Sequence, residues 1–362
     1  MTLNWTAELG SKLICGPSAL QILNQRIHVD KILICSSKSI MKLSAVKDFC
    51  DLFQGRDINV LGNIRPNPSP ADIDSAFKLI EGNPPELVIA IGGGSVIDFA
   101  KVLAALLSNS SVSSTLDLID LEKFEPRTCG LIAVPTTCGT GSEVTPFATI
   151  WAGDKSEKLS IDSPTIAPDM AILQGGLSSS CSPDQMLFSG LDAISHCVET
   201  LWNRNRTVLS EMFARESLES LIRTLPKALT ATSSVDELQD LQEAAMLAGL
   251  AISQSRTAIA HSISYPITSV YGMPHGLACS FTIPAIWAEI DDVKKMRLRH
   301  ASLIQQAVEL VESLNLRTEI VRWLSLPNST ALVGGMLSSN RAQNFIQDTN
   351  EKMVRNILKS SF

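Results

Sequence analysis

The chain has 362 residues, of which 45% are hydrophobic and 19% are charged, and its formal net charge is −7 at pH 7. A chain this apolar is not intrinsically disordered, and its length suffices for about two domains of ordinary size. The negative charge argues against a protein that binds a nucleic-acid backbone, because such binding depends on clustered Lys and Arg.

No segment of the sequence is predicted to cross a membrane or to direct secretion. Residues 1–12 carry Glu8 and lack the uninterrupted apolar stretch of a signal peptide. The most apolar region, 87–107, contains Asp98 and Lys101 and falls short of the ~20 apolar residues that span a bilayer. The eight cysteines include no CxxC pair, which argues against a thiolate zinc site or a redox dithiol. We therefore expect a soluble cytoplasmic protein with neither a membrane nor a nucleic-acid partner.

The N-terminal half alternates short β-branched runs with segments of helical length. This alternation is typical of βαβ units around a mainly parallel sheet, the architecture of many nucleotide-binding domains. The expected strands are 31–35, 59–61, 87–91, 130–134 and 170–173. The expected helices between them are 71–81 and 95–107.

A Gly/Ser-rich stretch at 174–181 separates this half from a helical one. We place the domains at 1–177, an α/β dinucleotide-binding domain, and 178–362, an all-α metal-binding and substrate domain. Ser182 and Gln185 flank a Pro-Asp pair, which predicts a capping box and a helix start. Two later helices are predicted from apolar faces, made of Leu209, Met212, Phe213 and Leu221 in one and Leu238, Leu241, Ala245 and Ala248 in the other.

Three glycines, Gly92–Gly94, follow a predicted strand and open a predicted helix. Backbone N–H groups and the positive end of the helix can hold a phosphate at such a turn. The turn departs from the GxGxxG fingerprint because Ile97 occupies the third glycine position, and the chain has no GxxxxGK[ST] motif. A tight connection without a ligand is the alternative interpretation.

A second loop, 135–143, follows the next strand and is rich in Thr, Ser and Gly. Its hydroxyl groups either contact a ligand or satisfy the backbone of the turn itself. Because two such loops end successive strands of one sheet, we predict a ligand crevice at that edge.

Four residues of the helical half form a candidate metal site. Asp192 and His196 are four residues apart and would share one face of a helix, whereas His261 and His275 lie in apolar surroundings. One carboxylate and three imidazoles would suit Fe²⁺, Zn²⁺, Mn²⁺ or Co²⁺ and leave a position for water or substrate. Each histidine taken singly is better explained as an ordinary hydrogen-bonded imidazole, and it is the four candidates together that favour a metal.

Together these segments resemble the iron-containing, or group III, alcohol dehydrogenase family over nearly the whole chain. The resemblance rests on four ordered motifs: GGGSVID from Gly92 with Lys101, PTTCGTGSEVT from Pro135, GLDAISH from Gly190 with Glu199, and PHG at 274–276. It implies a Rossmann-like N-terminal domain, an all-helical C-terminal domain, a nicotinamide cofactor and a homodimer.

The resemblance also implies a set of site residues. Asp192, His196, His261 and His275 would hold one divalent ion, Fe²⁺ or in some relatives Zn²⁺. The cofactor pyrophosphate would contact Gly93, Gly94, Ser95 and Asp98, and the same crevice would be lined by Thr136, Thr137, Thr140 and Ser142. Lys158 matches a lysine that reaches the cofactor ribose in relatives.

Two departures from the family pattern bear on specificity. NAD-preferring relatives carry an aspartate after the first strand, where this chain has Ser37 and Lys38. No carboxylate there repels a 2′-phosphate, so we predict that NADP is used, with NAD as the alternative. The second departure is Tyr265, which replaces a histidine suspected of relaying a proton and is our candidate for that role.

The segment around Tyr265 looks similar to the branch that reduces phosphonoacetaldehyde to 2-hydroxyethylphosphonate. Arg256 offers a planar donor fork suited to a phosphonate, although a structural ion pair is an equal interpretation. The principal alternative is a broad-range dehydrogenase of uncharged short-chain alcohols. A metal-dependent lyase or polyol oxidase, related to dehydroquinate synthase and glycerol dehydrogenase, and an inactive scaffold are further alternatives.

Overall fold

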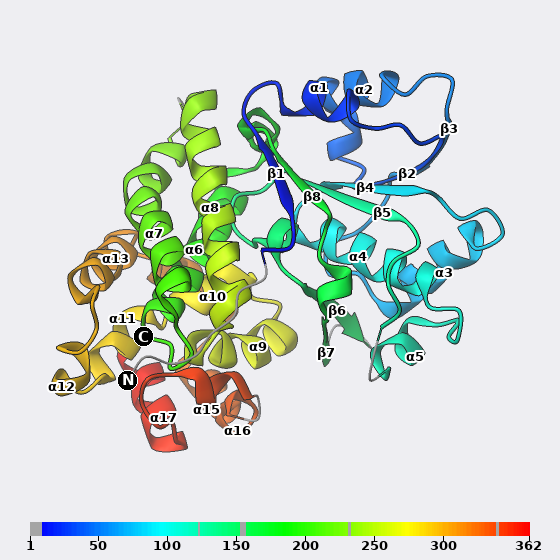
Figure 1. Ribbon diagram of the computed structural model, residues 1–362. Helices are drawn as coiled ribbons and strands as arrows, with labels where there is room; N and C mark the ends of the chain where they lie inside the picture. The colour runs from blue at the N-terminus through cyan, green and yellow to red at the C-terminus, as the bar shows by residue number, and fades with distance from the viewer. Residues whose placement is uncertain (1–8, 122–123, 153–156, 231–232, 338–339) are drawn as a thin grey trace. The chain divides into compact units, whose positions relative to one another are not determined.

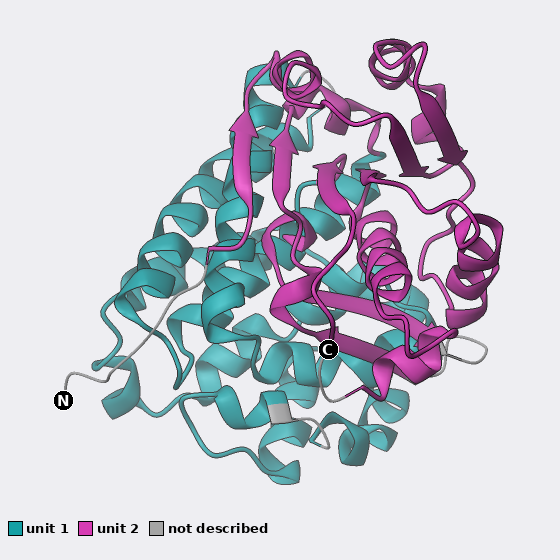
Figure 2. Cartoon of the chain, turned by 45° about the vertical axis from the view of Figure 1, so that its right-hand side comes forward, with its two compact units in different colours: residues 1–8, 138–140, 182–362 teal, residues 9–137, 141–181 magenta. Residues whose placement is uncertain are grey.

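A computed structural model describes residues 9–121, 124–152, 157–230, 233–337 and 340–362. The described chain forms two compact units (Figure 2), which are treated separately below. One comprises residues 9–137 and 141–181, and the other comprises residues 138–140 and 182–362.

The first unit is built on a sheet of six strands, all of them parallel to their neighbours (Figure 1). The strands are β1 (Lys12–Cys15), β2 (Lys31–Ser36), β3 (Asp57–Leu61), β4 (Leu87–Gly92), β5 (Gly130–Pro135) and β8 (Met170–Leu173), in the spatial order β1-β8-β5-β4-β2-β3. Its α-helices are α1 (Ala19–Asn24), α2 (Ser44–Asp51), α3 (Pro70–Ile80), α4 (Gly94–Ser108) and α5 (Thr115–Ile119). The expected Rossmann-like α/β architecture is therefore confirmed.

The central strands are buried on both faces because their successive residues enter different cores. In β2, Leu33 and Cys35 pack with α3 and α4, whereas Ile32 and Ile34 pack with α1 and α2. Because helices cover both faces, these strands are apolar throughout and do not alternate between apolar and polar residues. This explains why the strands were recognisable as short continuous apolar runs.

The five expected strands are all present, and each boundary differs from the structure by two residues or fewer. Strand β1 and the antiparallel pair of β6 (Phe147–Ala152) and β7 (Glu157–Asp162) were not anticipated.

The second unit is helical, as expected. Its α-helices are α6 (Pro183–Leu201), α7 (Val208–Ala228), α8 (Val235–Ser255), α9 (Ile259–Tyr271), α10 (His275–Ser280), α11 (Ile283–Glu289), α12 (Asp292–Lys295), α13 (Ala301–Ser313), α14 (Arg317–Trp323), α15 (Leu326–Ala331), α16 (Val333–Met336) and α17 (Glu351–Ser360). No helix among the described residues is long and apolar enough to cross a membrane.

Helix α6 begins where the sequence predicted it. The Ser182 hydroxyl accepts from the Gln185 N–H at 3.2 Å, and the Gln185 side chain accepts from the Ser182 N–H at 3.2 Å, which completes the capping box. The predicted face of α8 is likewise buried. The predicted face of α7 is wrong in part, because Met212 is 57% exposed and the buried face instead carries Ala214 and Leu218.

Candidate active site

The carboxyl ends of β2, β4 and β5 meet at one edge of the sheet. Ser36 is paired with Ile91, and Gly92 with Pro135, so the loops after these three strands start side by side. The direction of chain progression reverses between β2 and β4, which makes this edge the topological switch point where doubly wound sheets bind ligands. Within the first unit, the structure thus brings together the two loops on which the cofactor prediction rests.

The glycine turn opens α4 at this edge. Gly93 is the N-cap residue and Gly94 the first helical residue, so the first N–H groups of a 15-residue helix point out of its end. A Cβ atom on Gly92 would lie 2.7 Å from Cβ of Val96, so this glycine is required by packing. A Cβ on Gly93 would lie 3.2 Å from Cγ2 of Thr137, which places that threonine beside the turn.

The side chains of Asp98 and Ser142 form a hydrogen bond with each other. The Ser142 hydroxyl donates to Oδ1 of Asp98, and the Thr149 N–H donates to Oδ2 at 2.9 Å. Burial raises the pKa of Asp98, and the nearby Lys101 ammonium opposes that shift. Both carboxylate oxygens of Asp98 therefore hold the segment after β5 in place.

Lys101, which came with the glycine motif, lies at the centre of the same network. Its ammonium is fully buried and donates to the carbonyl oxygens of Thr145 at 2.9 Å and Phe147 at 2.7 Å. Burial lowers its pKa to about 8. Asp98 and Lys101 therefore hold the loop after β5 and the start of β6 in place.

The remaining cofactor candidates are distributed as follows. Ser37 follows β2, and its hydroxyl lies 3.1 Å from that of Ser39, next to the exposed Lys38. The hydroxyl of Ser95 accepts from the Asn67 N–H at 3.1 Å. The other candidates are Thr136, buried after β5, Lys158, in β7, and Thr140, which belongs to the helical unit.

Three helices of the second unit bring the metal candidates together. Asp192 and His196 come from α6, His261 from α9 and His275 from α10. Oδ1 of Asp192 lies 3.5 Å from Nε2 of His196, 3.5 Å from Nε2 of His261 and 3.9 Å from Nε2 of His275. The four side chains singled out from sequence therefore converge on one carboxylate oxygen.

The cluster has the electrostatics of a cation site. Within the described chain, Oδ1 of Asp192 and Nε2 of His261 are buried without a hydrogen-bond partner. Burial alone would raise the pKa of Asp192, but the three imidazoles, His196 most strongly, hold it below its usual range. Burial lowers the pKa of His196 to about 4, which favours the neutral ring that a ligand requires, whereas Cys279 and Glu199 raise the pKa of His261 despite its burial. These residues fit a divalent ion.

Glu199 supports the cluster from behind. Its carboxylate is fully buried and accepts from Nδ1 of His261 at 2.6 Å, which leaves Nε2 of that ring directed at Asp192. It also accepts from the backbone N–H groups of Ala258, Ala260 and His261, at the start of α9. A carboxylate that orients a ligating histidine in this way is a common partner of metal sites.

A close approach between α10 and α6 lets His275 reach Asp192. A Cβ atom on Gly276 would lie 1.8 Å from the carbonyl oxygen of Phe188 and 3.1 Å from Cβ of Asp192. Only a glycine fits there, so the glycine of the PHG motif is a packing residue of the metal site.

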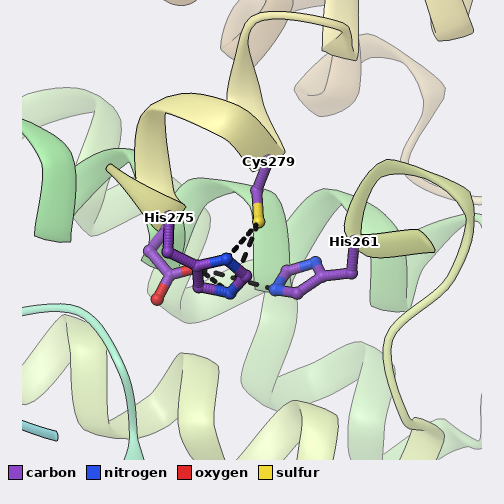
Figure 3. A group of neighbouring side chains, drawn as sticks. His261, His275 and Cys279 are labelled. Atoms are coloured by element: carbon purple, nitrogen blue, oxygen red, sulfur yellow. Dashed lines mark hydrogen bonds and ion pairs between the residues drawn. The ribbon is translucent and has the colours of Figure 1, made fainter. Parts of the chain in front are cut away.

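Cys279 was not predicted from the sequence as a site residue. Its sulfur belongs to a group, with donor atoms of Asp192, His261 and His275, in which all ligand atoms lie within 4.8 Å of one another. Figure 3 shows the sulfur directed at the ring of His275. The signal was available, because Cys279 is four residues after His275, the same spacing that identified His196.

The two candidates for substrate chemistry lie in different settings. Tyr265 stacks on His275, with ring centroids 5.8 Å apart at 13°, and the guanidinium of Arg341 lies 4.9 Å from its ring centre. Arg256 ends α8 with φ 65° and ψ 166°, a conformation that L residues rarely adopt. Tyr265 is thus beside the metal candidates, and Arg341 is a cation there that the sequence analysis did not single out.

Two family models account for most of the chain. Residues 10–175 match the iron-containing alcohol dehydrogenase model, and residues 186–319 match the model for the C-terminal part of the same family. The chain belongs to the iron-containing alcohol dehydrogenase family, a family of oxidoreductases. This confirms the family expected from the four motifs.

Individual relatives of this dehydrogenase family are distant. The aldehyde-alcohol dehydrogenase 2 of Entamoeba histolytica is 27% identical over 288 residues, 76% of this chain and 33% of that protein. The chain therefore spans about a third of that relative's length.

Solved structures share the fold over nearly the whole chain. A crystal structure of an iron-containing alcohol dehydrogenase is 25% identical, with a TM-score of 0.85 and 99% of both chains covered. The sulfoacetaldehyde reductase of Bifidobacterium kashiwanohense, in complex with NAD⁺, has a TM-score of 0.85 at 22% identity, with 99% of both chains covered. At 22% identity, the likeness to the sulfoacetaldehyde reductase shows a shared fold only.

Proposed function

We propose that the protein is a metal-dependent, NAD(P)H-linked alcohol dehydrogenase that reduces an aldehyde. The observation that carries the proposal is the convergence of Asp192, His196, His261 and His275 on one buried carboxylate oxygen. An ion bound there supplies a Lewis acid for the carbonyl oxygen, and a nicotinamide supplies the hydride. The residues of the chain would hold the ion and position the substrate.

We propose phosphonoacetaldehyde as the substrate, with 2-hydroxyethylphosphonate as the product. Arg256 would bind the phosphonate, because its fork of donors matches three equivalent oxygens. Its backbone is held by bonds from its N–H to the Ile252 carbonyl at 2.9 Å and from the Asn203 amide to its own carbonyl at 3.0 Å. Such constrained outliers cluster at functional sites, which supports the assignment.

Tyr265 is the proposed proton donor to the product oxygen. It contacts the rings of both His261 and His275, at centroid distances of 6.2 and 5.8 Å. Replacement by Phe keeps those ring contacts and removes only the hydroxyl. We expect Y265F to lower kcat much more than it raises KM, whereas full activity would assign the side chain to packing.

The cofactor proposed is NADP(H), held at the switch point of the first unit. The support is the N-terminus of α4, the neighbouring hydroxyl-rich loop, and Ser37 with Lys38 after β2 in place of an acidic residue. The family resemblance adds the proposals of a homodimer and of a cytoplasmic location.

The deciding experiment is NADPH and NADH oxidation by the full chain reconstituted with Fe²⁺ or Zn²⁺. Phosphonoacetaldehyde is compared with propanal and butanal, in the wild type and in R256A and R341A. Selective loss of the anionic substrate in R256A supports the proposal. The same loss in R341A alone would move the anion site to that residue.

Two other outcomes lead elsewhere. Turnover of the uncharged aldehydes alone would discard the phosphonate and leave a broad-range dehydrogenase. No oxidation by protein that retains its metal would favour the lyase or scaffold alternatives.

A further inference from the structure

We propose that Cys279 is a sulfur ligand of the metal ion that Asp192, His261 and His275 would hold. The inference rests on the proposed function in one respect, the presence of a metal at this cluster. It revises the expectation, drawn from the absence of CxxC pairs, that the chain has no thiolate ligand.

The donor atoms of the cluster are close enough to one another to share one ion. Ligand bonds of about 2.1 to 2.3 Å in a tetrahedral site place the donor atoms roughly 3.4 to 3.8 Å from one another. Sγ of Cys279 lies 3.6 Å from each ring nitrogen of His275, and Oδ1 of Asp192 lies 3.5 Å from Nε2 of His261. The sulfur of Cys279 therefore packs against the His275 ring and lies within 4.8 Å of the donor atoms of Asp192, His261 and His275, close enough to join them on one ion.

The local structure fixes the sulfur in that place. Cys279 is buried one turn after His275 on the same face of α10, and that helix is pressed against α6 at Gly276. A buried thiol otherwise behaves as a small apolar group, yet this one faces a carboxylate and two imidazoles. Its surroundings are therefore those of a ligand.

His196 lies outside this group of mutually close donors. Its ring stacks on that of His261, with centroids 5.0 Å apart at 19°, and it does not belong to the set of mutually close donors. If Cys279 binds the ion, it either takes the fourth ligand position in place of His196 or joins His196 to give five donor atoms. Because thiolate is a softer ligand than imidazole, Cys279 should favour Zn²⁺ over Fe²⁺.

Cobalt spectroscopy on the metal-free full chain tests the inference directly. Co²⁺ ligated by thiolate has an intense near-ultraviolet charge-transfer band, whereas its visible bands report binding by any ligand. We expect both features in the wild type and in C197S, and only the visible bands in C279S. Cys197 is the matched control, because it is a buried thiol of α6 whose Sγ contacts the Ser217 hydroxyl at 3.0 Å.

The outcomes separate this inference from the proposed function. Visible bands without the near-ultraviolet band in the wild type would overturn sulfur ligation and leave the metal site standing. No cobalt bands in the wild type would remove the metal site, and with it the proposed function. C279A provides a second variant, and circular dichroism of both variants identifies any that fails to fold.

Metal competition is the second readout. With equal Zn²⁺ and Fe²⁺ under anaerobic conditions, the bound Zn/Fe ratio should fall about tenfold in C279S relative to the wild type and C197S. An unchanged ratio would contradict the inference.

Discussion

The two candidate binding regions of this chain are built in opposite ways. The glycine turn is contiguous in sequence, and it offers backbone N–H groups whose direction is set by one strand and one helix. The metal cluster takes single side chains from α6, α9 and α10. A site made of backbone tolerates side-chain changes that preserve the turn, whereas one made of converging side chains depends on each of them.

Loss of the shared carboxylate should have the largest effect. In D192N the oxygen on which three imidazoles converge loses its charge, so we expect metal content near zero and kcat/KM lower by at least about 10³-fold. The checks are elemental analysis and NADPH oxidation. D184N, at an exposed position of the same helix, should retain both properties; retained metal in D192N would contradict the side-chain view of this site.

The next effect concerns the close contact of α10 with α6. G276A introduces a Cβ atom 1.8 Å from a carbonyl oxygen, and we expect a loss of about 3 kcal/mol in the free energy of unfolding, together with weaker metal binding. Urea denaturation measures the first quantity. The control is G334A, also in a helix, where a Cβ would meet nothing within 4 Å and should be neutral or stabilising.

Glu199 tests whether the support of a ligand matters as well as the ligand itself. E199Q keeps the shape but weakens the bond to Nδ1 of His261, so metal affinity should fall about 10- to 100-fold. Competition with a chelator measures the affinity. E216Q, on an exposed position of α7, should behave as the wild type; an unchanged affinity in E199Q would reduce that carboxylate to a helix cap.

The smallest effect is expected at the end of β2, beside the glycine turn. S37D adds a carboxylate after β2 that accepts from a ribose 2′-hydroxyl and repels a 2′-phosphate, so the NADH/NADPH ratio of kcat/KM should rise about tenfold. S39D is the control for charge alone, because its hydroxyl lies only 3.1 Å from that of Ser37. Equal cofactor ratios in S37D and the wild type would place the ribose elsewhere.

The fold was largely predictable because its signals are local. A parallel sheet covered on both faces gives continuous apolar strands, and the Ser182 to Gln185 box marks a helix start within four residues. Strand β1 was not predicted, and only one of its four side chains, that of Ile14, is buried. Met212 was misplaced because helical spacing defines several possible faces, and only packing selects one.

The site was predictable to the extent that residue type limits chemistry. Few histidines occur in the chain, so the three near the cluster stood out. Cys279 and Arg341 did not, because a buried cysteine and a half-buried arginine are ordinary until their neighbours are known. The engagement of Asp98 by Ser142 and Thr149 depends on tertiary contacts that no spacing reveals.

The contacts of Glu199 bear on how the protein acquires its ion. Its carboxylate caps the start of α9 through bonds that need no metal, so the donor on that helix is ordered before an ion arrives. Domains whose ligands are ordered only by the ion unfold when it is removed. Here we expect that a chelator removes the ion and leaves a folded protein that can bind metal again. The ion bound in a cell should then depend on which exchangeable metal is available when the folded protein binds it, and not on which was available during synthesis.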